Sequence, residues 1–337
     1  FSPVELVKPI KLPLLERARS KYVEKDPPFV YRGHSKSIKA ILGRHKAQAM
    51  HIYFGHTAVS LLPLIQAWSK PCLVSFHGVD ARPRPEEPYY DSGMRKMLQA
   101  VRLVLVRSQS LADRLLSWGC PEHKIRLNRA GIPMDAFPYF QRQEPKDGAW
   151  VIVQACRLIE KKGLPTTIRA FAQFSQKHPL ARLILAGEGP DQTGLEQLAE
   201  DLGIRAKVDF AGFLDQKALA ALYGESHIFI HPSQTTAAED REGVPNSLME
   251  AMATGLPVVA TRHSGIPELV EENRSGILVE EQDVQGAAQA LLELAERPEY
   301  RKGLGVAAAQ RVRERHELHE QIVKLEDCYE ELLTLPF

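Results

Sequence analysis

The sequence predicts an α/β protein made of two domains, each built on a parallel β-sheet. Its 337 residues exceed what a single hydrophobic core usually takes. Short apolar runs alternate with amphipathic segments along nearly the whole chain, which is the order expected when helices connect parallel strands. A polar segment with proline and glycine, residues 141–148, interrupts this alternation. We therefore place the division between the domains there.

The apolar runs predict buried strands in chain order, at residues 50–54, 72–76, 103–106, 150–154, 182–186, 208–210, 227–230 and 257–261. Between them, apolar residues recur with helical spacing at residues 166–177, 194–202, 216–224 and 284–296. Open parallel sheets bind ligands beyond the carboxyl ends of their strands. We therefore expect the functional residues in the loops that follow these strands.

The division gives an N-terminal domain over residues 1–145 and a C-terminal domain over residues 146–310. The tail, residues 300–333, has a long charged helical pattern. We expect its last part, residues 311–337, to form a C-terminal helix that packs back onto the N-terminal domain.

Charge divides the chain, although the net charge is only +1. Residues 1–149 hold 24 Lys and Arg against 13 Asp and Glu, whereas residues 150–337 hold 19 against 29. A basic half suits an anionic partner, such as an acidic lipid surface or a charged substrate, or it is simply a solvated basic face. No basic stretch is interleaved with aromatic residues, so a nucleic-acid partner is not expected.

The bulk sequence favours a cytoplasmic protein that is at most peripheral to a membrane. No run approaches the roughly 20 consecutive apolar residues of a membrane span, and residues 1–11 lack a secretory signal pattern. The four cysteines are scattered singly, at Cys72, Cys120, Cys156 and Cys328. This scatter fits neither a disulfide framework nor metal-ligand spacing, so we expect a reducing compartment.

The strongest functional signal is the segment 239–255, EDREGVPNSLMEAMATG. A polar loop runs into a helix that is expected to begin near Asn246 or Ser247 and to end at Gly255. The free N–H groups at residues 244–247 and the positive end of the helix dipole favour a phosphate. Glu242 and Glu250, with seven residues between them, can hydrogen-bond sugar hydroxyls on either side of it. The alternative for Glu250 is a capping box with Ser247.

Two further loops follow predicted strands. Arg157 and Lys162 come after the strand at 150–154 and are placed to clamp a diphosphate, the arginine as a bidentate fork and the lysine as a mobile charge. The alternative is a solvated basic loop. Gly187 and Gly189 follow the strand at 182–186 and allow either a close approach to a ligand or a tight turn.

In the first half, His77 follows the strand at 72–76, with Asp80 three residues later. A histidine at the end of a strand suits hydrogen bonding to a sugar or acid–base chemistry, or it is satisfied by the local backbone. The loop with Gly55 and His56 is similar. No Ser-His-Asp order, paired Cys and His, or H-E-x-x-H pattern appears.

Together these motifs resemble the retaining glycosyltransferases of family 4, whose GT-B fold has two Rossmann-like domains facing each other across a cleft. Glu242 and Glu250 match the E-x7-E pair of that family, and residues 251–261 (AMATGLPVVAT) and 264–270 (SGIPELV) continue its pattern. The motif R-L-x-x-x-K-G at 157–163, the glycine pair and G-F-L at 212–214 follow in the family's order. Matching stretches run from about residue 50 to 290, and the glutamate block looks most like enzymes of bacterial exopolysaccharide synthesis, including the colanic-acid type.

The resemblance implies roles for the matching residues. Arg157 and Lys162 would neutralise the diphosphate of a nucleotide sugar, while Glu250 would hold the ribose and Glu242 the transferred sugar. His77 would reach that sugar from the N-terminal domain, which gives a catalytic set of His77, Glu242, Arg157 and Lys162. The implied donor-binding set is Glu250, Gly243, Val244, Pro245, Asn246, Ser247, Gly187, Gly189, Phe213 and Leu214, with Phe213 beside the base. The implied acceptor side is Gly55, His56 and Asp80.

The reaction implied is transfer of a hexose, with retention of configuration, from a nucleoside-diphosphate sugar such as UDP-glucose. The acceptor would be a saccharide or a polyprenyl-linked saccharide, which an anionic membrane surface would present. The resemblance implies no cofactor and no metal, because positive side chains and a helix end stabilise the leaving diphosphate.

Two features depart from the family pattern. Nothing before residue 50 matches its first strand and glycine-rich loop, so Phe1 is expected to lie part-way into the N-terminal domain. Cys156 replaces the glycine often found before the arginine. The alternative functions are a sugar-nucleotide epimerase or hydrolase on the same fold, and a non-catalytic nucleotide-sugar-binding or scaffold protein.

Overall fold

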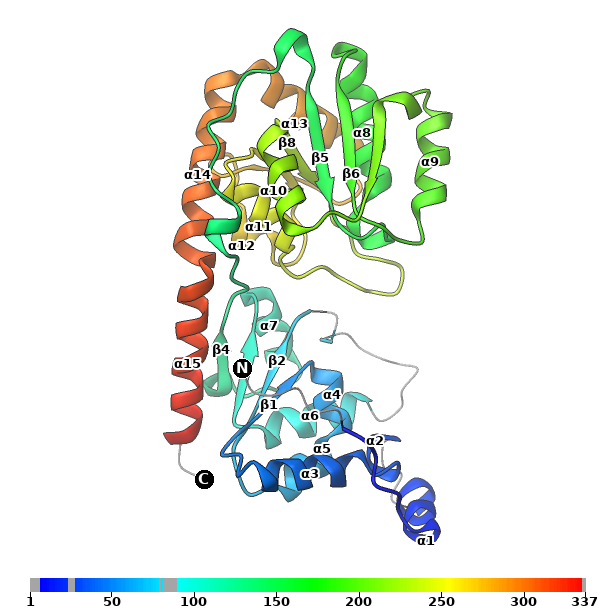
Figure 1. Ribbon diagram of the computed structural model, residues 1–337, viewed down its shortest axis with the longest axis vertical. Coiled ribbons are helices and arrows are strands. Elements are labelled where there is room, and N and C mark those ends of the chain that lie inside the picture. The colour runs from blue at the N-terminus through cyan, green and yellow to red at the C-terminus, as the bar shows by residue number, and fades with distance from the viewer. Residues whose placement is uncertain (1–6, 24–27, 79, 82–89, 335–337) are drawn as a thin grey trace. The chain divides into compact units, whose positions relative to one another are not determined.

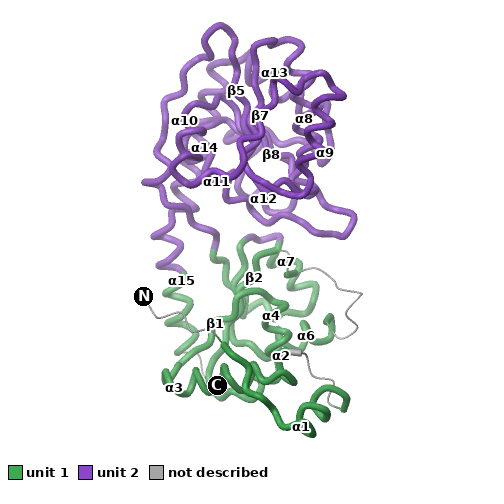
Figure 2. Tube along the Cα trace, turned by 45° about the vertical axis from the view of Figure 1, so that its right-hand side comes forward, with its two compact units in different colours: residues 1–107, 111–128, 325–337 green, residues 108–110, 129–324 purple. Residues whose placement is uncertain are grey.

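The computed structural model describes residues 7–23, 28–78, 80–81 and 90–334. These residues form two compact units, each with its own parallel sheet, which confirms the predicted α/β class. Unit 1 comprises residues 1–107, 111–128 and 325–337, and unit 2 comprises residues 108–110 and 129–324 (Figure 2). Within the described part of the chain, no helix combines the length and low polarity that crossing a bilayer requires.

Unit 1 is built on a four-stranded sheet with the order β1-β2-β3-β4. The strands are Met50–Tyr53 (β1), Cys72–Phe76 (β2), Leu103–Val106 (β3) and Ile125–Leu127 (β4). The helices that precede β4 along the chain are Leu14–Ala18 (α1), Pro28–Tyr31 (α2), His34–Arg44 (α3), Gly55–Ser60 (α4), Leu62–Ala67 (α5), Tyr90–Ala100 (α6) and Gln109–Ser117 (α7), with a π-helical turn at Arg19–Val23 (Figure 1).

The two faces of the unit 1 sheet have different cover, because successive side chains of a strand point to opposite faces. Val74 and Val104 pack into the cluster formed with the helices between the strands. Leu73 packs instead with Cys328 and Leu332 of the C-terminal helix α15, Leu318–Thr334. The end of the chain therefore completes the core of unit 1.

Unit 2 is built on a six-stranded sheet with the order β10-β9-β8-β5-β6-β7. The strands are Val151–Ala155 (β5), Arg182–Ala186 (β6), Val208–Gly212 (β7), Ile228–His231 (β8), Val258–Thr261 (β9) and Ile277–Val279 (β10). The helices are Leu164–Lys177 (α8), Gln192–Asp201 (α9), Gln216–Glu225 (α10), Asn246–Ala253 (α11), Ile266–Leu269 (α12), Val284–Glu296 (α13) and Pro298–His316 (α14).

The strand order of unit 2 fixes where a ligand is expected. The chain runs outward from β5 through β6 to β7, then returns to the other side of β5 and runs through β8 and β9 to β10. The loops after β5 and β8 therefore leave the sheet in opposite directions and open a crevice at the carboxyl ends of these strands. Ile152 and Val153 on β5 face different helical layers, one with α8 and α13 and the other with α10 and α11.

The predicted strands and helices agree with the observed ones to within two residues at either end. The three-residue strands β4 and β10 were not predicted. Such runs are too short to show a periodicity, and the sequence does not show that they pair with neighbouring strands.

The boundary between the units differs from the predicted one. It follows residue 128 rather than the polar segment 141–148. Ile132 and Phe137 are buried in the core of unit 2, and the Arg142 guanidinium donates to the carbonyl of Thr254 at 2.6 Å. The polar segment 141–148 is therefore part of unit 2 and does not link the two units.

The charged tail is two helices rather than the single one that its pattern suggested. Glu317 separates α14 from α15 with an extended backbone, φ −64° and ψ 130°. Ile132 pairs with it as a strand would: its N–H donates to the His316 carbonyl at 2.8 Å, and its carbonyl accepts from Leu318 N–H at 3.1 Å. These hydrogen bonds replace the helical ones that the break removes.

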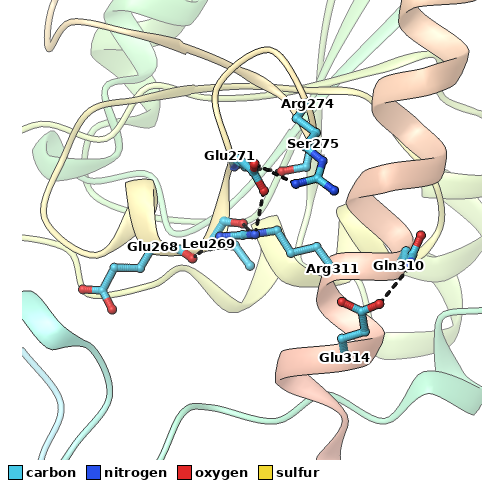
Figure 3. A network of polar contacts seen from close by, with 8 residues as sticks. All are labelled: Glu268, Leu269, Glu271, Arg274, Ser275, Gln310, Arg311 and Glu314. Atoms are coloured by element: carbon cyan, nitrogen blue, oxygen red, sulfur yellow. Dashed lines mark hydrogen bonds and ion pairs between the residues drawn. The ribbon is translucent and has the colours of Figure 1, made fainter.

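Arg311 fastens α14 to the segment that follows β9 (Figure 3). Its guanidinium donates to the carbonyls of Glu268 and Leu269 at 3.0 and 2.5 Å, and to the Glu271 carboxylate at 3.0 Å. The carbonyls at the end of α12 lack partners within their own helix, so this arginine satisfies them. This contact holds α12 and the residues after it against α14.

Candidate functional site

A pocket of about 860 Å³ opens at the carboxyl ends of β5, β6 and β8 in unit 2. It lies where the strand order predicts a ligand crevice. Its lining comes from the ends of β5 and β6, from the loops after β5, β6, β7 and β8, from α10 and from the start of α11: Ala155, Cys156, Arg157, Lys162, Ala186, Gly187, Glu188, Phe213, Leu214, Leu219, Glu242, Val244, Pro245, Asn246, Ser247 and Glu250. Most of the residues that the sequence suggested for a donor site therefore share one pocket, whereas Gly189 and Gly243 lie outside its lining.

The loop after β5 supplies the positive charge of the pocket. Arg157 is exposed to solvent, so its guanidinium is accessible to a ligand. Lys162 forms an ion pair with Glu242, and the side chains of the two residues are only 11% and 14% exposed. The turn depends on Gly163, whose φ is +64° and whose hypothetical Cβ would lie 1.8 Å from the Pro232 carbonyl oxygen. The basic loop is thus packed against the loop after β8.

The start of α11 supplies backbone donors. The helix begins at Asn246 with Pro245 as N-cap, and the first helical hydrogen bond runs from Met249 N–H to the Pro245 carbonyl at 3.3 Å. The N–H groups just before Met249 have no acceptor within the helix and can bind an anion. Pro245 itself has no N–H, so the expected row of donors at residues 244–247 is interrupted there.

Glu250 is not a capping residue. Because the N-cap is Pro245, with no side-chain cap, the capping box with Ser247 does not form. Burial raises the pKa of the Glu250 carboxyl to about 7. Within the described part of the chain, no hydrogen bond or ion pair to its carboxylate is found, which leaves this group available to a ligand.

The segment that carries Glu242 is fixed by residues that the sequence did not single out. The Glu242 N–H donates to His263 Nε2 at 2.9 Å, and His263 Nδ1 lies 2.6 Å from Glu281 Oε1. Lys161 and Asp240 add an ion pair at 3.2 Å. No sequence motif links these positions, since their contact depends on how the loops after β8, β9 and β10 meet.

A second buried histidine lies below the pocket. His231, at the end of β8, is fully buried and burial lowers its pKa well below the ordinary value, as does the charge of Lys162. Neither ring nitrogen has a hydrogen-bond partner among the described residues. The imidazole is therefore neutral, and it adds no charge beneath Lys162.

The glycine pair sets how closely the loops after β5 and β6 approach each other. A Cβ on Gly187 would lie 1.9 Å from the Cys156 carbonyl oxygen, and one on Gly189 would lie 2.2 Å from that of Leu158. Leu158 N–H also donates to the Glu188 carbonyl at 2.9 Å. Both glycines thus let the loop after β6 lie against the loop after β5, which favours the turn alternative for Gly189.

Phe213 and Leu214 follow β7 and line the same pocket. The Phe213 side chain is 76% exposed, so its ring is free to stack on a planar ligand.

The remaining candidates lie in unit 1. Asp80 is fully buried, and its carboxylate accepts hydrogen bonds from the N–H groups of Gly55 at 2.8 Å and of His77 and Gly78 at 2.9 Å. It therefore ties together the two loops that carry His77 and His56.

The His77 ring lies among aromatic side chains. It contacts the rings of Tyr53 and Phe54, with centroids 5.7 and 4.7 Å away. Burial and the charge of Arg107 lower the pKa of His77, so the imidazole is neutral at physiological pH. Its Nε2 has no hydrogen-bond partner in the described ranges, and the contact with a sugar expected for it stays a prediction.

The chain matches known families over most of its length. Residues 11–136 match Glycosyltransferase Family 4, and residues 136–311 match Glycosyl transferases group 1. The chain is 38% identical over 216 residues to a putative colanic acid biosynthesis glycosyltransferase, WcaL, of Escherichia coli K12. That match covers 64% of this chain and 53% of WcaL, so the chain spans about half the length of this relative.

Two further comparisons extend over more of the chain. It is 34% identical over 281 residues to a GDP-mannose-dependent alpha-(1-6)-phosphatidylinositol monomannoside mannosyltransferase of Mycolicibacterium smegmatis, covering 80% of this chain and 73% of that protein. The crystal structure of Anabaena Alr3699/HepE in complex with UDP superimposes with a TM-score of 0.75 at 20% identity, covering 91% and 84% of the two chains. The second likeness shows that the fold is GT-B.

Proposed function

Because the chain belongs to the group 1 glycosyltransferases of the GT-B fold, we propose that it transfers a hexose from a nucleoside-diphosphate sugar to a saccharide or lipid-linked saccharide during exopolysaccharide synthesis. The observation that carries the proposal is the pocket of unit 2, which combines a guanidinium, an ammonium, a helix start and two carboxylates. A diphosphate needs the first three, and the hydroxyls of its two sugars need the carboxylates. An epimerase or a nucleotide-sugar-binding scaffold would need the same groups, and the match to glycosyltransferase families is what favours a transferase.

In the proposed complex, the diphosphate binds between the basic loop and the start of α11. Arg157 and the free N–H groups stabilise the charge that develops on the leaving diphosphate, without need of a metal. Lys162 exchanges its partner Glu242 for a phosphate oxygen. Glu242 then accepts hydrogen bonds from hydroxyls of the transferred hexose, and Glu250 from those of the ribose.

Same-face attack by the acceptor hydroxyl gives retention of configuration. No carboxylate is assigned as a nucleophile, since Glu242 and Glu250 are both engaged with hydroxyl groups. His77 of unit 1 is proposed to contact the hexose, with Gly55 and His56 near the acceptor.

The donor base is proposed to be uracil, with Phe213 beside it. Similar proteins differ in this respect: HepE is described in complex with UDP, and the mycobacterial relative is GDP-mannose-dependent. The decisive experiment is calorimetric titration of the full chain with UDP, GDP and ADP, then with UDP-glucose, for wild type and Glu250→Ala. Tight binding of UDP that weakens in the variant supports the proposal, tight binding of GDP reassigns the base, and no binding favours a scaffold.

The basic charge of residues 1–149 supports a peripheral position on an anionic membrane, where a polyprenyl-linked acceptor would be available. Co-sedimentation with vesicles should then increase with the fraction of anionic lipid and fall with added salt. Equal sedimentation with neutral vesicles would contradict this part of the proposal.

A further inference from the structure

The loop after β8, residues 232–245, places Glu242 in the pocket. Two side chains that do not line the pocket, those of His263 and Glu281, hydrogen-bond to this loop. The imidazole of His263 follows β9 and is 1% exposed. The carboxylate of Glu281 follows β10 and is 32% exposed. Neither belongs to a motif that the sequence pointed to, and neither lines the pocket.

The hydrogen bonds fix the tautomer of His263. Its Nε2 lies 2.9 Å from the Glu242 N–H, which is a donor, so Nε2 accepts and carries no proton. The proton is therefore on Nδ1, which donates to Glu281 Oε1 at 2.6 Å. The imidazole is neutral in this arrangement, because a doubly protonated ring has no acceptor to offer.

Glu281 holds the same loop at a second point. Its Oε2 accepts from the Thr235 N–H at 2.7 Å, and Oε1 lies 3.3 Å from the Thr235 hydroxyl. One carboxylate thus contacts the loop directly at Thr235 and, through His263, at Glu242. Burial opposes its ionisation, but the Thr235 N–H and the His263 imidazole outweigh burial and lower the pKa of Glu281.

These contacts matter for the direction of the Glu242 side chain. The loop has few regular hydrogen bonds of its own, and Glu239 within it has a positive φ of 56°. The ion pair with Lys162 is lost when that lysine turns to a phosphate, as the proposed function requires. The backbone at Glu242 then depends on His263 to keep the carboxylate aimed at the sugar.

We propose that His263, oriented by Glu281, is a positioning residue that fixes the main chain at Glu242 and so aligns its carboxylate with the hydroxyls of the transferred sugar. This inference rests on the proposed function. It separates two parts of the donor. The sugar needs the His263 contact, whereas the nucleoside diphosphate is held by Arg157, Lys162, the start of α11 and Glu250 and does not need it.

The test compares variants of the full chain in two measurements, the Kd for UDP and the kcat/KM for UDP release from the sugar nucleotide. In His263→Phe, kcat/KM should fall about 10- to 100-fold, the size expected for a small misplacement of a substrate-aligning group. The Kd for UDP should stay within about threefold of wild type. His263→Gln, whose amide oxygen can accept from Glu242 N–H while its amide donates to Glu281, should recover a large part of the loss.

Glu281→Gln should lower kcat/KM in the same way as His263→Phe, but by a smaller factor. It replaces His263→Phe in the test if that variant does not fold. Glu280→Gln is the matched control: Glu280 is adjacent, 71% exposed and paired with Arg262 instead, so neither measurement should change. Near-normal kcat/KM in His263→Phe and Glu281→Gln, or a parallel loss of UDP affinity that shows a merely structural role, would overturn the inference. If wild type itself binds no nucleoside diphosphate, the proposed function fails and this inference falls with it.

Discussion

The two units each hold a carboxylate among the candidate site residues, and its surroundings are opposite in the two. In unit 1, the Asp80 carboxylate is fully buried and accepts from three backbone N–H groups. In unit 2, Glu250 is partly buried with no such donor among the described residues, and its pKa is raised to about 7. A saturated carboxylate orders a loop, whereas a desolvated one without donors retains its capacity for a ligand. The sequence alone does not distinguish the two, because the difference depends on whether backbone N–H groups surround the carboxylate in the fold.

The largest effect is expected from removing the Asp80 carboxylate, which tests whether it orders the loops of unit 1. Asp80→Ala leaves the N–H groups of Gly55, His77 and Gly78 buried without an acceptor, so we expect unit 1 to lose about 4 kcal/mol of unfolding free energy. Hydrogen exchange of β1 and β2 measures this loss. Asp91→Ala, at the exposed start of α6, is the control and should cost under about 1 kcal/mol. UDP affinity should be unchanged in both variants. An Asp80→Ala protein with the unfolding free energy of wild type would show that Asp80 does not order these loops.

Arg157 is the opposite case to Asp80, because its side chain is available to a ligand and is not needed to hold the fold. Arg157→Ala should lower turnover about 100-fold or more, by analogy with loss of one transition-state donor, while the unfolding free energy changes little because the side chain is exposed. Steady-state kinetics of UDP release measure the effect. Arg182→Ala, at the other end of the neighbouring strand β6 and 62% exposed, should keep wild-type turnover. Equal turnover in the two variants would remove Arg157 from the reaction.

Glu250 should show its desolvation in the dependence of stability on pH. Its folded pKa is above the unfolded value, so the folded state binds more protons between about pH 4.5 and 7, and the unfolding free energy falls as the pH rises through this window. Glu250→Gln removes this fall. We expect wild type to lose about 2 kcal/mol relative to the variant between pH 5 and pH 8, in urea unfolding. The variant should bind UDP more weakly even though it is the more stable protein at pH 8, and parallel pH curves would show that Glu250 has an ordinary environment.

The sequence predicted the elements that repeat with a period and the groups that sit in motifs. Apolar runs located β2, β3 and β6 without error, and the family resemblance grouped Arg157, Lys162 and Glu250, which line one pocket. Contacts between loops of distant strands could not be found this way. The His263–Glu281 pair is created by the neighbouring positions of β9 and β10.

Two errors have the same physical origin. The tail pattern continued through Glu317 because local propensity favours helix there, but pairing with Ile132 outside the helix decides the break. Likewise, the polar composition of residues 141–148 suggested a linker, although Arg142 binds carbonyls of unit 2. Long-range partners, which composition does not reveal, overrode local preference in both places.

The smallest effect is expected at Phe213, which tests whether an exposed ring at the pocket contacts the ligand. Its ring is 76% exposed at the pocket, so Phe213→Ser removes little packing and should change the unfolding free energy by under about 0.5 kcal/mol. Stacking of an aromatic ring on a base is worth about 1 to 3 kcal/mol, and the low end applies to a ring that water reaches from one side. We therefore expect UDP to bind about fivefold more weakly, measured by calorimetry, with the same factor for UDP-glucose because the sugar lies elsewhere. Phe213→Tyr keeps the stacking surface and should restore the wild-type Kd. If the serine variant binds UDP as wild type does, the base lies away from β7, and the exposed ring is left as an apolar side chain that serves no ligand.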